Sequence, residues 1–166
     1  MEDLEQRFWY GGLEASVKDL LSESVLLIKK VAVWTEKFSD YSFVVFPAAK
    51  AYEGFLKKVF LDLGFISQEE YYGQRFRIGK ALNPSLDKKY RQTEGIYDQV
   101  IRFCGGDNTL ADQMWTTWKS CRNLIFHFFP KEKNAVTFVE AQERIDTIIE
   151  TMESVIRGCR IKHEES

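Results

Sequence analysis

The apolar residues of this chain recur every three or four positions over long stretches, and this spacing constrains the fold more than any other feature. It is clearest in residues 13–38 and 138–157. Such spacing gathers the apolar side chains on one face of an α-helix, whereas a β-strand would need them at every second position. The second stretch follows Thr137 and includes Glu140, a pair whose side chains can cap the first backbone N–H groups of a helix. The pattern predicts an all-α protein.

Breaks in this pattern divide the chain into five principal helices, expected near residues 13–38, 47–64, 93–104, 109–129 and 138–157, with a short helix within 76–83. Pro47 suits the first turn of the second helix, where its missing N–H costs nothing. Residues 43–46 could form a short strand, but they have no evident partner strand, and we expect a buried connection there. A length of 166 residues fits one domain with its own core. We therefore predict a single domain, residues 1–166, folded as an up-and-down bundle.

Composition excludes several classes of protein. A net charge of -2 argues against a protein that coats nucleic acid non-specifically, although a local basic site remains compatible with it. The longest apolar candidate for a membrane span, residues 25–34, is interrupted by Lys29 and Lys30. No signal peptide is recognisable, and the cysteines are odd in number and lack metal-ligand spacing: Cys104, Cys121 and Cys159. We expect a reduced, cytoplasmic protein without a metal or another cofactor.

Residues 65–93 show little helical pattern and have a basic second half. The cations are Arg75, Arg77, Lys80, Lys88, Lys89 and Arg91, against the single acid Asp87. Aromatic residues, among them Phe76 and Tyr90, lie between these cations. Cations mixed with aromatic rings suit single-stranded RNA, because the rings stack on bases while the cations pair with phosphates. The alternative is an ordinary solvated loop with one short helix.

The stretch from residue 115 to residue 130 carries the best candidates for chemistry. Arg122, Asn123 and His127 lie within two helical turns of one another, before Pro130. An arginine can bind a phosphate through two hydrogen bonds, and a histidine can transfer protons near neutral pH. With no set of metal ligands and no Ser/His/Asp set in the sequence, these residue types point to metal-free phosphodiester chemistry.

The spacing from Arg122 to His127, with the polar Asn123 directly after the arginine, resembles the signature of the HEPN superfamily of all-helical ribonucleases. Residues 47–58 (PAAKAYEGFLKK) and 118–123 (WKSCRN) resemble the HEPN domain of the RNase LS type of toxin. The resemblance implies a toxin-like or defence-related endoribonuclease that cleaves single-stranded RNA without metal. It also implies a homodimer with the site at the dimer interface, and an antitoxin or another regulatory protein as partner.

The same resemblance assigns roles to the three residues. His127 would be the general acid or base, Arg122 would hold the scissile phosphate, and Asn123 would orient the imidazole or donate to the phosphate. One position departs from the family pattern. HEPN proteins paired with nucleotidyltransferases often have a tyrosine two places after the histidine, and Phe129 stands there in this chain. We therefore do not expect inactivation by nucleotidylation at that position.

On an ideal helix Arg122 and His127 point about 140° apart, so one straight helix cannot aim both at one phosphate. The length of the arginine, fraying before Pro130, or a second copy across a two-fold axis would have to close this gap. Each residue also has a structural alternative. Arg122 could lie along aromatic rings and pair with an acid, and His127 could be a cation near a helix C-terminus. Glu53 could be such an ion-pair partner or could line the active cleft. The rival function is a non-catalytic HEPN-like module that dimerises or binds a protein.

Overall fold

The computed structural model describes residues 4–90, 95–127 and 134–159, in which all regular elements are helical. The α-helices are α1 (Ala15–Val31), α2 (Ser42–Asp62), α3 (Gln68–Tyr72), α4 (Ile78–Ala81), α6 (Tyr97–Phe103), α7 (Thr109–Trp118) and α8 (Phe138–Gly158). Two 3-10 turns, Leu4–Gln6 and Tyr10–Gly12, precede α1, and a π-helical turn, Lys119–Asn123, follows α7. The predicted all-α fold is confirmed.

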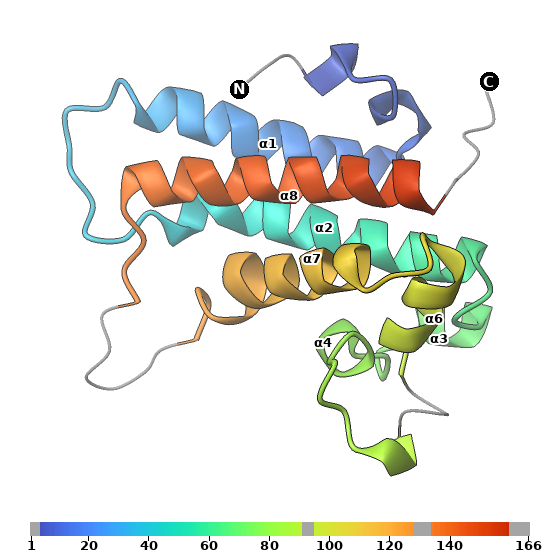
Figure 1. The fold of residues 1–166 in the computed structure, drawn as a ribbon. Helices are drawn as coiled ribbons and strands as arrows, with labels where there is room; N and C mark the ends of the chain where they lie inside the picture. Colours follow the sequence, from blue (N-terminus) through green and yellow to red (C-terminus); the bar gives the residue numbers. More distant parts are fainter. Residues whose placement is uncertain (1–3, 91–94, 128–133, 160–166) are drawn as a thin grey trace.

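The long helices α1, α2, α7 and α8 lie alongside one another as a bundle (Figure 1). The short helices α3 and α6 lie at one end of it, and α4 lies beneath α7 in this view. Helix α2 has buried residues along its whole length, Val44, Tyr52 and Phe60 among them, and it packs against both α1 and α8. Small side chains let its neighbours approach closely. At Gly54, an added Cβ would lie 3.4 Å from Val17 of α1. Helix α2 is therefore the centre of the core.

The second helix starts earlier than predicted. It begins at Ser42, whose backbone N–H donates to the Asp40 carboxylate at 2.9 Å, so Pro47 lies inside the helix rather than in its first turn. Residues 43–46 are helical, which makes the expected buried connection wrong. Val44 and Val45 are buried while Phe43 and Phe46 are exposed, a division that a helix accommodates. The missing N–H of Pro47 costs this helix one backbone hydrogen bond.

The first helix ends earlier than predicted, at Val31 instead of Phe38. Trp34 and Phe38 lie in the loop after it, with their ring centroids 5.8 Å apart, and they are 42% and 41% exposed. Their helical spacing in the sequence therefore reflects an exposed aromatic group rather than another turn of core-facing helix.

Helix α8 has the predicted start. The Thr137 hydroxyl accepts a hydrogen bond from the Glu140 N–H at 3.2 Å, and the Glu140 carboxylate accepts one from the Thr137 N–H at 2.7 Å. Helix α7 has no such cap, and near its start the Asp112 carboxylate accepts a hydrogen bond from the Tyr97 hydroxyl. Among the described residues no helix is both long and apolar enough to cross a membrane.

Two of the three cysteines form a disulfide, which joins Cys104 after α6 to Cys159 after α8. The expectation that all cysteines are reduced is therefore wrong for this pair, while Cys121 is free and buried. The partners are separated by 55 positions in the sequence, and no local pattern indicates that they lie together. The cytoplasmic location stays a prediction, and this disulfide is the observation that weighs against it.

The N-terminal turns are fastened to α8 through one carboxylate. Glu153 accepts hydrogen bonds from Arg7 at 2.8 Å and from the Trp9 indole at 3.0 Å, and it pairs with Arg157 at 2.9 Å. These donors, the Trp9 N–H first and Arg157 next, lower the pKa of Glu153. A carboxyl group whose pKa is depressed by folding stabilises the folded protein above its unfolded pKa, and this contribution is lost as the pH falls through the folded value.

We expect Glu153→Gln to reduce the free energy of unfolding at pH 7 by about 1 to 2 kcal/mol, because charge-assisted hydrogen bonds become neutral ones. The difference from wild type should shrink as the pH falls from the unfolded pKa of Glu153 through its lowered folded-state pKa, because below that pKa both side chains are uncharged. Urea unfolding at several pH values measures this. Glu150→Gln, an exposed position one turn earlier on α8, is the matched control and should have little effect at any pH. A Glu153→Gln deficit that is the same at pH 3 and pH 7 would contradict the prediction.

Candidate functional site

The predicted motif starts in a π-helical turn. The α-helix that was expected to continue to residue 129 ends at Trp118, and the Leu124 N–H donates to the Lys119 carbonyl five positions back, at 3.0 Å. A neighbouring helix supports this turn, because the guanidinium of Arg144 in α8 donates to the Ser120 carbonyl. A π-helical turn is rare and is often found at functional sites.

Arg122 is held between an acid and an aromatic ring. Its Nη2 lies 3.2 Å from Oε2 of Glu53 on α2, and its Cζ lies 5.3 Å from the centroid of the Trp118 ring. Glu53 is thus an ion-pair partner, one of the two roles considered for it. Arg122 lies on an aromatic ring and pairs with an acid, as its structural role would require. Both side chains remain accessible, at 37% for Arg122 and 33% for Glu53. The guanidinium is therefore fixed in place and still reachable by a ligand.

Asn123 shares the π-helical turn with Arg122 and is half-buried. His127 lies beyond the turn and is exposed. The backbone there is tied by Asn134, whose Nδ2 donates to the carbonyls of Leu124 and His127 at 3.4 Å each. Because the α-helix has ended before Arg122, the angle of an ideal helix no longer separates Arg122 from His127. Phe129 and Pro130 lie outside the described residues.

Trp118 joins the motif to the basic segment. A Cβ added at Gly79 in α4 would lie 2.6 Å from the indole Nε1 of Trp118, so this helix sits directly on the ring that Arg122 also contacts. The sequence pattern did not indicate this role of Trp118. Its position four residues before Arg122 is the signal that could have identified the contact, since residues four apart are neighbours on a helix.

We expect Gly79→Ala to destabilise the protein by about 1 to 3 kcal/mol, because the new methyl group overlaps the buried Trp118 indole. In a chain of this size that lowers the melting temperature by roughly 2–4 °C per kcal/mol. The matched control is Gly54→Ala. Its Cβ would make only a close contact with Val17, and alanine favours the helix by about 1 kcal/mol. Equal melting temperatures for the two variants would contradict the close approach of α4 to Trp118.

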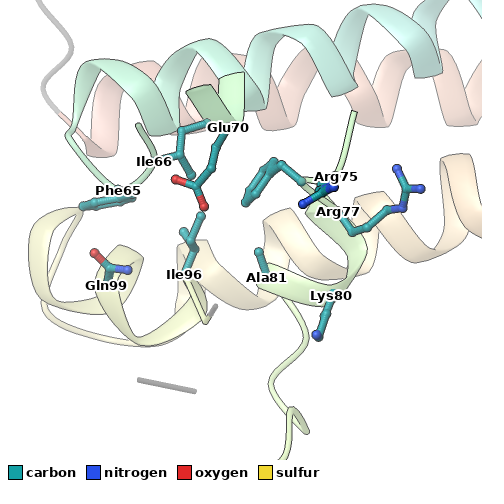
Figure 2. Close-up of a pocket in the computed structure, with 10 residues that line it drawn as sticks. Phe65, Ile66, Glu70, Arg75, Arg77, Lys80, Ala81, Ile96 and Gln99 are labelled. Atoms are coloured by element: carbon teal, nitrogen blue, oxygen red, sulfur yellow. The ribbon is translucent and has the colours of Figure 1, made fainter. Parts of the chain in front are cut away.

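The six predicted RNA-binding cations do not all lie in one place in the structure. Arg75, Arg77 and Lys80 line one cavity of about 300 Å³, which Figure 2 shows between α3, α4, α6 and the end of α2. Lys88 and Lys89 are exposed beyond it. Lys89 and Lys80 are linked through Tyr90, since the Nζ of each lies 4.6 Å from the centroid of that ring. Arg91 lies outside the described residues. The basic stretch is thus partly a built cavity rather than a solvated loop throughout.

In the described part of the chain, no group of three or more His, Cys, Asp or Glu side chains is placed to hold a metal ion. The candidate site is therefore a guanidinium fixed by Glu53 and Trp118, an amide beside it, an exposed imidazole, and a basic cavity across the indole. No protein-family model matches the sequence, and no curated protein or solved structure matches the chain. The HEPN resemblance accordingly stays a prediction from the motif.

Proposed function

We propose that this protein is a metal-independent endoribonuclease that cleaves single-stranded RNA and acts as a toxin or in defence. The observation that carries the proposal is the position of the π-helical turn, which coincides with Arg122 and Asn123 of the predicted motif. A structural arginine needs no such turn, whereas a π-helical turn is often found at functional sites. The accessible, oriented guanidinium of Arg122 adds to this support.

In the proposed reaction the ribose 2′-hydroxyl is the nucleophile. His127 takes the hydroxyl proton as the oxygen attacks the adjacent phosphorus, and the bond from phosphorus to the 5′-oxygen of the next nucleotide breaks. The leaving 5′-oxygen receives a proton from a second imidazole, that of a second copy of the chain. The products are a 2′,3′-cyclic phosphate and a 5′-hydroxyl. Arg122 stabilises the charge that builds on the phosphate oxygens, and Asn123 orients the imidazole or donates to the phosphate.

A two-fold homodimer supplies that second imidazole, and an exposed aromatic surface beside the motif supports it. We define this surface as the exposed residues Trp34, Phe38, Phe43 and Phe46 together with the half-buried Phe126. Phe46 is 53% exposed, and its ring centroid lies 5.4 Å from that of Phe126, one residue before His127. A self-complementary interface there would bring the two motifs together. An antitoxin or another regulatory protein is the further partner that the proposal implies.

Incubation of the protein with single-stranded RNA in excess EDTA tests the function. We expect cleavage to continue, with 2′,3′-cyclic phosphate and 5′-hydroxyl ends, because no step uses a metal. RNA carrying 2′-O-methyl groups and DNA of the same sequence serve as controls and should both resist, since neither has the nucleophile. Cleavage that stops in EDTA, or that also consumes the 2′-O-methyl strand, would exclude this mechanism.

The second candidate is a non-catalytic helical module that dimerises or binds a protein. Two observations favour it, the ion pair that engages Arg122 and the exposed aromatic surface. Light scattering at tens of micromolar together with the RNA assay separates the candidates. A dimeric mass without RNA cleavage supports the module, and a strictly monomeric mass excludes the proposed two-copy reaction.

A further inference from the structure

The cavity among the short helices α3, α4 and α6 has two walls, one aromatic and polar and the other cationic. Phe65 and Gln99 lie on one side, and Arg75, Arg77 and Lys80 lie along the other, with the Glu70 carboxylate directed between them (Figure 2). Its volume of about 300 Å³ lies at the lower end of the range for small-molecule sites. It is separate from Arg122, although its α4 wall rests on Trp118.

The wall formed by Arg75, Arg77 and Lys80 has N–H groups that can bind an anion. Arg75 makes no hydrogen bond or ion pair within the part of the chain that the structure describes, and its guanidinium is exposed. Arg77 is held in place by donating to the Gln74 carbonyl at 2.8 Å, which leaves further N–H groups for a ligand. Guanidinium groups bind phosphate oxygens through paired, charge-assisted hydrogen bonds.

The other wall fits a flat ring with polar edges. The Phe65 ring, in edge-to-face contact with Phe103 at 5.3 Å, offers a planar surface. Glu70 uses one carboxylate oxygen, Oε2, to accept from the Ser67 N–H at 2.8 Å and from the Ser67 hydroxyl at 3.1 Å. Its other oxygen, Oε1, takes no part in this cap. The amide of Gln99 is anchored to the Gly95 carbonyl at 3.1 Å. A carboxylate only accepts, so it favours a ring edge that donates.

We propose that this cavity binds a nucleoside phosphate, with the base against Phe65 and Glu70 and the phosphate toward Arg75, Arg77 and Lys80. Adenine, cytosine and guanine carry an exocyclic amino group that can donate to Glu70, whereas uracil presents carbonyl oxygens beside its one N–H, so uridine phosphates bind more weakly. The nucleoside phosphate is either one unit of an RNA strand or a free nucleotide. Only the first case rests on the proposed function.

Calorimetric titration of the whole protein with AMP, adenosine and inorganic phosphate tests the assignment. We expect AMP to bind more tightly than either part alone and more tightly than UMP. Arg75→Gln should weaken AMP binding about tenfold, the effect of one lost charge-assisted contact. The matched control is Arg102→Gln, an equal change of charge at an exposed position on α6 outside the cavity. AMP binding no tighter than phosphate, or equal weakening in the two variants, overturns the proposal.

Competition identifies the source of the ligand. If AMP displaces a single-stranded RNA from the His127→Ala protein, and Arg75→Gln weakens both ligands, the cavity is a subsite of the RNA strand. If AMP binds with the expected dependence on Arg75 but leaves RNA binding unchanged, the ligand is a free nucleotide. AMP binding without any RNA cleavage would contradict the proposed ribonuclease activity and support the nucleoside phosphate site. RNA cleavage without AMP binding would support the activity and contradict the site.

Discussion

Replacing His127 or Arg122 by alanine lowers the rate of RNA cleavage by on the order of a hundredfold or more, if the proposed reaction is correct. The imidazole moves the proton, and the guanidinium stabilises charge that exists only as the phosphorus is attacked. Both changes should leave the fold intact. His127 is exposed, and an ion pair as accessible as that of Arg122 with Glu53 contributes at most about 1 kcal/mol. Single-turnover cleavage of a labelled RNA measures the rate, and circular dichroism checks the fold.

Glu53→Gln separates the two roles of Arg122. If Arg122 only pairs with Glu53, removing either partner has the same small consequence for cleavage. If Arg122 contacts the phosphate, its loss is far more damaging than the loss of Glu53, because the Trp118 ring still holds the guanidinium in the Glu53→Gln variant. The accessible Lys119, one turn earlier, offers a control for loss of a positive charge nearby. Wild-type rates in a well-folded His127→Ala protein would place the activity elsewhere.

Loss of the disulfide has the second large expected effect. Cys104→Ser should lower the free energy of unfolding by about 4 kcal/mol, because the unfolded chain regains the entropy of a loop of more than fifty residues. Unfolding in urea with and without reductant measures it, and the reductant should destabilise the wild type but not the variant. Cys121→Ser is the control, since it also replaces a cysteine by a serine but breaks no bond between distant parts of the chain.

Thiol titration in denaturant gives an independent reading of the same bond. One thiol, that of Cys121, should react without reductant and three after reduction. Three reactive thiols in protein that was never reduced would contradict the bond and would favour the reduced protein expected from the composition. Retained stability in Cys104→Ser would contradict only the loop-entropy argument.

The sequence predicts those helices whose apolar face and capping residues lie within their own stretch of the chain. Helix α8 has a regular apolar face and a capping box in its own sequence, and its predicted bounds are correct to one residue. The start of α2 was missed because Pro47 looked like a first-turn residue, while the Asp40 cap lies seven positions earlier. The spacing of apolar residues within a helix does not show where the helix begins when a side chain in the preceding loop caps it.

The candidate site was predictable as a list of residues but not as an arrangement. The expected angle between Arg122 and His127 assumed a regular helix, whereas the structure has a π-helical turn there, which Arg144 of α8 contacts. The contact of Arg122 with Glu53 joins positions 69 residues apart, and that of Gly79 with Trp118 also joins two separate elements. Such pairs depend on how the helices pack, which the spacing of apolar residues does not encode.

The bond between Cys104 and Cys159 also makes one covalent ring of the chain between them. That ring contains α7, the π-helical turn, Arg122, Asn123 and His127, together with α8. A protease that cuts once anywhere between the two cysteines therefore opens the ring without dividing the molecule. On a denaturing gel the cut protein migrates as one species until the disulfide is reduced. The bond keeps the start of α7 joined to the end of α8.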